Sequence, residues 1–209
     1  MIQELIDITL RILFPPRCAV CRTFSENTLC SDCLSKIVMI KKHEGYVFSI
    51  CAYKGVIEKA VKLLKFRGKT KLSAPLGRLL ADHNPFHDAD AIIPVPLHKN
   101  RLKERGVNQS ALISSELSRK LGVPVIENAL IRKKDTKHMF ELGRKERREN
   151  INNAFEVISA EKVKGASLIL VDDIYTTGIT ASACRRTLLG SGAKNVRVLV
   201  LSRASLDMI

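Results

Sequence analysis

Two adjacent carboxylates follow an apolar run in the last quarter of the chain. Asp172 and Asp173 come directly after residues 167–171 and shortly before the small, hydroxylic stretch 176–180. A glycine-containing turn at the start of a helix presents backbone N–H groups that suit a phosphate. Carboxylates would repel that phosphate, so they should accept hydrogen bonds from a neutral diol or act through a metal ion. These residues predict a ribose-phosphate site.

Two other interpretations of this stretch compete with a ribose-phosphate site. An apolar strand that ends in Asp-Asp also occurs in Walker-type nucleoside triphosphatases, but the chain contains no GxxxxGK[ST] loop. Asp173 alone could cap the helix that follows, which would leave Asp172 and the threonine-rich turn unexplained.

Cysteine spacing predicts a metal site near the N-terminus. Four of the six cysteines form two CxxC pairs, which are Cys18 with Cys21 and Cys30 with Cys33. Each pair aims two thiolates at one point, and two such pairs complete a closed, structural zinc site. A redox dithiol would explain one pair but not two. The remaining Cys51 and Cys184 lie in apolar segments, so we expect them in the core.

Composition limits the class of protein and the class of partner. The chain has 209 residues, of which 45% are hydrophobic, and this content excludes general disorder. Its 35 Lys and Arg outnumber 21 Asp and Glu, giving a net charge of +14 that predicts an anionic partner. No apolar run approaches the roughly 20 residues of a membrane span. Residues 1–16 predict a short amphipathic helix rather than a signal peptide, so we expect a cytoplasmic protein.

Strands and helices are expected to alternate along the remainder of the chain. Apolar runs predict strands at 46–53, 89–96, 123–128, 167–171 and 195–202. Helical periodicity and stop signals predict helices at 55–68, 72–82, 108–121 and 179–190. This alternation predicts a doubly wound α/β domain with a mostly parallel sheet.

The polar run 41–45 suggests a junction between a small module at 1–45 and a main domain at 46–209. In the first helix of the main domain, we expect Lys59, Lys62 and Lys65 to turn away from the apolar face.

Several segments together resemble the ComF family, bacterial competence proteins that join a zinc-binding N-terminus to a phosphoribosyltransferase-like domain. The matching segments are LFPPRCAVC, LCSDC, LLKFRG, IPVPLHKNRLKERGVNQSALI, ERRENINNAFEV and LILVDDIYTTGIT. The last of these resembles the phosphoribosyl-pyrophosphate motif of type I phosphoribosyltransferases. The resemblance therefore implies a type I phosphoribosyltransferase-like fold with a small N-terminal four-cysteine zinc module.

The same resemblance implies which residues would bind phosphoribosyl pyrophosphate. Asp172 and Asp173 would hold the ribose hydroxyls, with Tyr175 and Ile179 shaping the adjacent loop. The residues that would wrap the sugar phosphate are Thr176, Thr177, Gly178 and Thr180. The residues matching the pyrophosphate loop and its flanks are Pro94, Val95, Pro96, Leu97, His98, Arg101, Arg105, Asn108 and Gln109. The two arginines would face the phosphates because a guanidinium fork suits phosphate oxygens, and we expect His98 at the surface.

A basic, aperiodic segment matches the mobile loop that closes over the ligand in these enzymes. Its basic residues are Arg132, Lys133, Lys134, Lys137, Arg144, Lys145, Arg147 and Arg148. The same charges would equally suit a nucleic-acid backbone. The segment is therefore interpreted as a lid or as a nucleic-acid contact.

The functional expectation has two branches. Phosphoribosyl transfer needs magnesium on the pyrophosphate, a held ribose and an aligned acceptor, and the sequence shows no acceptor site. The resemblance and the net charge favour a DNA-uptake protein of natural transformation that binds phosphoribosyl pyrophosphate and single-stranded DNA, with a competence helicase as a candidate partner. With 5% aromatic residues and no Trp, base-stacking positions are expected to be sparse. The alternative is an active phosphoribosyltransferase of nucleotide metabolism.

Overall fold

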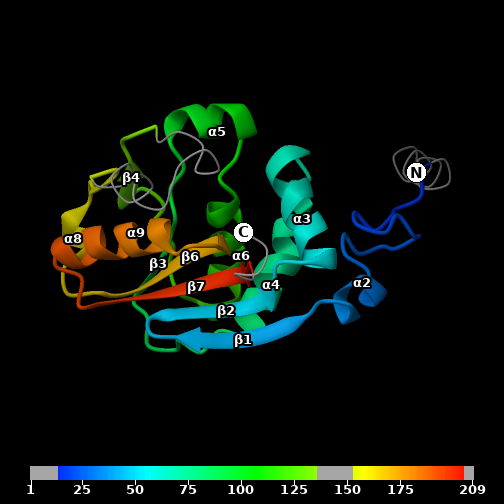
Figure 1. Cartoon of the computed structure of the whole chain (residues 1–209), viewed down its shortest axis with the longest axis horizontal. Coiled ribbons are helices and arrows are strands. Elements are labelled where there is room, and N and C mark those ends of the chain that lie inside the picture. The colour runs from blue at the N-terminus through cyan, green and yellow to red at the C-terminus, as the bar shows by residue number, and fades with distance from the viewer. Residues whose placement is uncertain (1–13, 136–152, 205–209) are drawn as a thin grey trace, which may run out of the picture.

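The computed structural model describes residues 14–135 and 153–204 (Figure 1). The helix expected within residues 1–16 falls almost entirely outside this part of the chain. Helices along it are α2 (Ser31–Ser35), α3 (Gly55–Phe66), α4 (Ser73–Asp82), α5 (Lys99–Arg105), α6 (Gln109–Leu121), α8 (Ala160–Val163) and α9 (Ile179–Gly190), with a 3-10 turn at Thr70–Leu72. None of the helices described is long and apolar enough to cross a bilayer.

A five-stranded sheet runs through the middle of the molecule in the order β1-β2-β7-β6-β3 (Figure 1). Its strands are β1 (Met39–Glu44), β2 (Val47–Ala52), β7 (Asn195–Arg203), β6 (Ser167–Tyr175) and β3 (Ala91–Pro94). Neighbours β2, β7, β6 and β3 pair in parallel, and only the edge strand β1 is antiparallel. A separate antiparallel pair joins β4 (Leu130–Arg132) to β5 (Phe155–Val157). The predicted mostly parallel α/β sheet is confirmed.

Two apolar cores cover the two faces of this sheet. Because side chains alternate along a strand, Ile169 and Val171 of β6 face one core, which α3, α4 and α6 complete. Leu168 and Leu170 face the other core, which α9 and the β4–β5 pair complete. The sheet is thus covered on both sides, as a parallel sheet requires.

Two strand predictions differ from the structure. β6 continues through Tyr175, so the paired aspartates lie inside the strand rather than after it. Residues 123–128 form only an isolated bridge from Val125 to Ile92, in place of the predicted strand. Pro124 has no N–H to donate, and the backbone bonds of the segment to Ile92 run through Pro124 O and Ile126 N.

The polar run expected at a domain junction lies in the β1–β2 hairpin. Lys41 and Lys42 are exposed on β1, and Glu44 pairs with Val47 across the turn. The run therefore belongs to the edge of the main sheet as well as to the connection from the cysteine module. The division into 1–45 and 46–209 remains a prediction.

Candidate functional site

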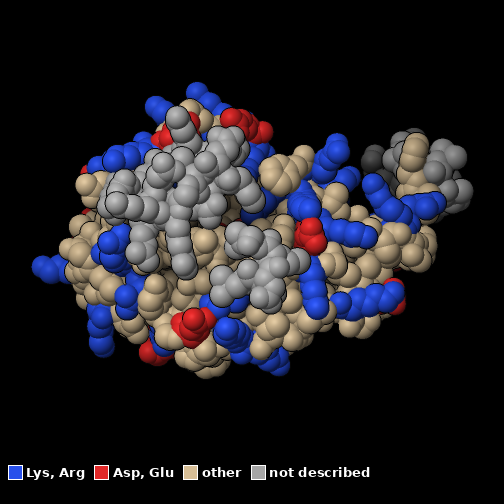
Figure 2. Space-filling view, viewed as in Figure 1, with Lys and Arg blue, Asp and Glu red and all other residues tan. Residues whose placement is uncertain are grey.

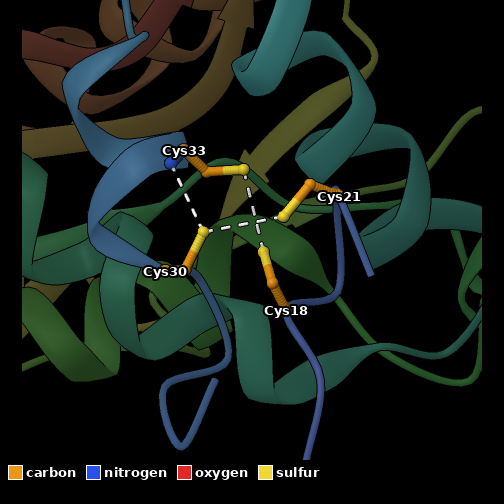
Figure 3. A group of neighbouring side chains, drawn as sticks. All are labelled: Cys18, Cys21, Cys30 and Cys33. Atoms are coloured by element: carbon orange, nitrogen blue, oxygen red, sulfur yellow. Dashed lines mark hydrogen bonds between the residues drawn. The ribbon is translucent and has the colours of Figure 1, made fainter. Parts of the chain in front are cut away.

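The four cysteines of the CxxC pairs meet at one point (Figure 3). Their sulfur atoms lie within 4.8 Å of one another, with Sγ–Sγ distances of 3.8 Å for Cys18–Cys33 and 3.6 Å for Cys21–Cys30. Tetrahedral zinc with Zn–S bonds of about 2.3 Å places its sulfur ligands about 3.8 Å apart. The donor set therefore fits a closed zinc site, which leaves no coordination position for a substrate.

Tight local turns hold these thiols in place. The Arg22 N–H donates to the Cys18 carbonyl at 3.0 Å, and Arg22 adopts a φ of 68°. Cys30 caps α2, where its Sγ accepts from the Cys33 N–H at 3.4 Å. Burial acts to raise the pKa of Cys18, but backbone N–H donors, led by that of Cys21, outweigh it and lower this pKa to about 6. A thiolate at this position suits a metal ligand.

The cysteine module shares its apolar core with the main sheet. Leu29, Cys33 and Ile37 are buried in the same core as α3 and α4. Cys51 and Cys184 are also fully buried, and burial raises both of their pKa values, as predicted for core cysteines.

The two aspartates of β6 bond to different helices, Asp172 to α6 and Asp173 to α3. Asp172 Oδ1 accepts a hydrogen bond from Ser110 Oγ at 3.1 Å and another from the Asp173 N–H at 2.9 Å. Burial, followed by the negative charge of Asp173, raises the pKa of Asp172 to about 7. The Asp172 carboxyl is therefore partly protonated at neutral pH.

Asp173 has a partner that sequence reasoning missed. Lys65 Nζ lies 2.8 Å from Asp173 Oδ2 and 2.9 Å from Oδ1, and the side chains are only 16% and 7% exposed. The prediction that Lys65 faces solvent is wrong, whereas Lys59 and Lys62 are exposed as predicted. A buried carboxylate requires a cation, and the last turn of α3 lies close enough to supply it. The available signal was that Lys65 follows Val61 by four residues, at the border of the apolar stripe.

The turn after β6 depends on one glycine. Gly178 has a φ of 71° and precedes α9 as its N-cap, which rules out Asp173 as the cap of this helix. A Cβ at Gly178 would collide with the hydroxyl of Tyr175, whose ring is covered by the Arg203 guanidinium at 4.5 Å. The turn thus brings backbone N–H groups and the positive end of the α9 dipole next to the end of β6.

The loop after β3 is fastened to β6 and α6. The Val95 N–H donates to the Val171 carbonyl at 2.9 Å, which extends the sheet pairing past Pro94. Asn108 Nδ2 donates to the Val95 carbonyl at 3.1 Å, while Asn108 Oδ1 caps α6 by accepting from the Ser110 N–H. The loop, the start of α6 and Asp172 therefore lie together. Pro96 is buried and Leu97 half-buried in the same loop.

The segment after this loop forms the helix α5. His98 caps α5, its Nδ1 accepting from the Asn100 N–H at 3.3 Å, and it is 5% exposed. The prediction of a surface His98 is therefore wrong, because its ring is used in capping. Arg105 Nη1 donates to Gln109 Oε1 at 3.1 Å, and Gln109 is buried. Arg101 is half-buried on the same helix.

Part of the basic segment lies beside this site. The Arg132 guanidinium stacks over Phe155 at 5.6 Å, and Lys133 Nζ pairs with Glu156 at 3.2 Å. Burial lowers the pKa of Arg132, and the positive charge of Arg101 adds to this effect, so the two guanidinium groups lie within electrostatic reach. Lys134 is exposed. The other basic residues named for this segment lie outside the described residues: Lys137, Arg144, Lys145, Arg147 and Arg148.

Solved structures with a similar arrangement include two proteins whose names mention phosphoribosyl chemistry. Glutamine phosphoribosylpyrophosphate amidotransferase from B. subtilis is 19% identical, with a TM-score of 0.44 over 61% of this chain and 25% of that one. Adenine phosphoribosyltransferase from Thermoanaerobacter pseudethanolicus is 15% identical, with a TM-score of 0.42 over 68% of this chain and 82% of that one. Likenesses at this level assign no ligand and no residue role.

Sequence comparisons are more specific. Residues 9–47 match the model of the double zinc ribbon domain, which supports structural zinc at the four cysteines. Competence protein F of Haemophilus influenzae is 36% identical over 69% of this chain and 66% of its own length, so the chain spans slightly less than two thirds of that relative. Competence protein ComFC of Bacillus subtilis is 26% identical over 90% of this chain and 78% of its own. DNA utilization protein YhgH of Escherichia coli O157:H7 is 31% identical over 90% of this chain and 83% of its own. On this evidence the chain belongs to the ComF family of competence and DNA utilization proteins.

Proposed function

We propose that this protein binds phosphoribosyl pyrophosphate with magnesium at the carboxyl end of β6, binds single-stranded DNA on its basic surface, and acts in DNA uptake. The observation that carries the proposal is the convergence of three segments at one edge of the sheet. They are the Asp172–Asp173 end of β6, the loop at 94–98 and the Gly178 turn before α9. Ligands of doubly wound sheets bind beyond this edge.

The charges at this edge suit a ribose next to phosphates. Lys65 neutralises Asp173 and burial favours the protonated form of Asp172, so the pair repels a phosphate less than two free carboxylates would. In the proposed complex the two aspartates hold the ribose hydroxyls. Magnesium lies on the pyrophosphate, where it offsets the remaining negative charge.

Donors on both sides of the aspartates suit the phosphates. In the proposed complex, the Gly178 turn and the neighbouring threonines hold the sugar phosphate by backbone N–H and hydroxyl donors. The 94–98 loop takes the pyrophosphate, with Arg101 and Arg105 of α5 supplying positive charge. Zinc at the four cysteines has a structural role here and takes no part in this binding.

The DNA part of the proposal is supported by charge and by family membership. A net charge of +14 suits a polyanion. The curated relatives are named for competence and for DNA utilization. We further propose that the protein acts in the cytoplasm, with a competence helicase as a candidate partner. The alternative function, phosphoribosyl transfer to an acceptor in nucleotide metabolism, would be supported by pyrophosphate release that depends on an added nucleobase.

Calorimetry with matched glycine variants tests the ligand. Wild-type protein should bind phosphoribosyl pyrophosphate in the presence of magnesium, and Gly178→Ala should bind about tenfold more weakly or worse, since its methyl meets Tyr175 and strains the turn. Gly165→Ala is the control, because Gly165 has a φ of 75° and open space around its Cβ position. Equal affinities for both variants, or no binding by the wild type, would contradict the proposed ligand.

A salt titration tests the DNA part separately. The affinity for an oligothymidine should fall steeply as salt rises, because Lys and Arg contacts to phosphates release counterions. A flat salt dependence, or no binding at low salt, would remove DNA from the proposed function and leave the ribose ligand untouched.

A further inference from the structure

An aromatic ring stands exposed at the end of α3. Phe66, the last residue of that helix, is 66% exposed although it directly follows Lys65, whose side chain is only 16% exposed. A phenyl ring on the surface forgoes the burial that usually stabilises it. The position of Phe66 matters because the preceding residue, Lys65, pairs with Asp173. The ring therefore lies on the turn of α3 that contacts the proposed ribose site.

A guanidinium covers part of this ring. Arg105, at the end of α5, has its Cζ 5.3 Å from the centroid of Phe66. Arg105 is itself held by Gln109 at 3.1 Å. Burial lowers its pKa and the carboxylate of Asp173 acts in the opposite direction, so Arg105 is within electrostatic reach of the proposed site. Phe66 and Arg105, here called the Phe66–Arg105 platform, therefore join α3 to α5 beside the end of β6.

Positive charge borders the platform just after α3 and along α5. Arg67 and Lys69 follow α3, and Lys99 and Lys103 lie on α5, and all four are exposed. Figure 2 shows Lys and Arg side chains along α3 and around α5 on the face seen in Figure 1. An exposed ring among cations combines the two elements that bind single-stranded nucleic acids, base stacking and phosphate attraction.

We propose that the Phe66–Arg105 platform stacks one base of a single-stranded nucleic acid whose phosphates lie along the basic side chains of α3 and α5. The inference rests on the DNA part of the proposed function and names the position where a base is held. One stacked base explains how a chain with few aromatic residues engages single strands, and it makes the contact insensitive to base identity. It also places the strand next to the proposed ribose ligand.

A matched pair of phenylalanine variants tests the platform. Phe66→Leu keeps an apolar side chain but removes the aromatic face, and Phe24→Leu is the control because Phe24 is 64% exposed in the cysteine module. Affinity for a labelled oligothymidine should fall roughly 5- to 150-fold in Phe66→Leu, the range expected for one stacked base, and stay unchanged in Phe24→Leu. The salt dependence should stay as in the wild type, because the phosphate contacts remain.

An abasic oligonucleotide of the same length separates stacking from charge. Wild type and Phe66→Leu should bind it equally, since it offers phosphates and no base. Phe66→Trp adds the only tryptophan of the chain, and its fluorescence should change on adding oligothymidine and not on adding the abasic strand.

The outcomes distinguish this inference from the proposed function. Equal binding of oligothymidine by wild type and Phe66→Leu overturns the platform alone. The same fold-loss on oligothymidine and on the abasic strand also overturns it, because the effect would then come from charge or folding. A wild-type protein that binds neither oligonucleotide overturns the DNA part of the proposed function together with the platform.

Discussion

The cysteine module and the carboxyl end of β6 are two polar sites built in opposite ways. All four thiols of the module lie between Cys18 and Cys33, and local turns aim them at one point. The other site draws Asp172 and Asp173 from β6, Ser110 from α6 and Lys65 from α3, and the last contact spans 108 residues. The first site is set by spacing, whereas the second exists only once the sheet and its helices have packed.

The two sites also differ in what they add to stability. A closed zinc site contributes binding energy directly to folding. The β6 site buries carboxylates whose desolvation opposes folding unless a partner offsets it. Metal binding should therefore stabilise the folded chain. Asp172, whose pKa is raised, should instead lower its stability at neutral pH, where the unfolded carboxyl ionises more readily.

The largest expected effect is on the zinc side of this comparison. Cys33→Ser should abolish stoichiometric zinc and lower stability more than any change at the β6 site, since zinc binding by structural sites of this kind has an apparent free energy of about 10–16 kcal/mol. Metal analysis and thermal denaturation of the purified protein measure both effects. Cys51→Ala, in the shared core, should lower stability while zinc is retained. A Cys33→Ser protein with a full equivalent of zinc would show that the module is not a four-thiolate site.

The next largest effect concerns the buried ion pair. Lys65→Met should lower the free energy of unfolding by about 3–5 kcal/mol, because it leaves the Asp173 carboxylate buried without a cation. Lys62→Met on the same helix is the control. Its pair with Glu58 is exposed, so this variant should lose much less stability than Lys65→Met.

Denaturant unfolding of both lysine variants decides whether Lys65 has this role. Adding Asp173→Asn to Lys65→Met should recover part of the loss, since no unpaired charge is then buried. Similar small losses in Lys65→Met and Lys62→Met would mean that the β6 site tolerates an uncompensated carboxylate, and its desolvation would then not oppose folding.

The smallest effect of this series depends on pH. The folded chain keeps the Asp172 proton up to a pKa of about 7, whereas an unfolded Asp releases it near pH 3.9. Folding thus takes up a proton between these values, and this contribution to stability is lost as the pH rises from about 4 to 7. Relative to wild type, Asp172→Asn should gain about 2 kcal/mol of stability between pH 5 and 7.5. Chemical denaturation at the two pH values measures the gain.

An exposed aspartate provides the reference for that pH series. Asp82→Asn, at the end of α4, changes the same side chain at an exposed position and should follow the wild type across the window. Parallel pH curves for wild type and Asp172→Asn would show that Asp172 ionises freely in the folded state.

Sequence reasoning succeeded where the physical cause is local. The apolar stripe of α3 and the buried run at the start of β6 follow from periodicity, and the helix from Gln109 to Leu121 ends at Gly122, which has a φ of 71°. The four cysteines belong to the same class, since their spacing alone brings them together.

Contacts across the fold escaped the same reasoning. Lys65 reads as one more surface lysine until packing brings a carboxylate next to it. His98 reads as a surface residue because a cap is visible only when α5 is known to begin at Lys99. Ser110 carries no sequence signal at all, yet it donates to Asp172. The Lys65 and Ser110 contacts depend on which segments the sheet order makes neighbours, and alternation of elements does not specify that order. The His98 cap is local and depends instead on where α5 begins.

Zinc binding also bears on the edge strand β1, which follows the cysteine module in the chain. Among the described residues β1 pairs with β2 alone, so its outer row of backbone groups is unpaired, and Lys41 and Lys42 help to keep other strands away. The strand follows Ile37, which anchors the cysteine module in the shared core. Withdrawing the metal would loosen that anchor and free an unpaired strand edge to recruit further chains. We therefore expect metal-free protein to self-associate more readily than the zinc-bound form.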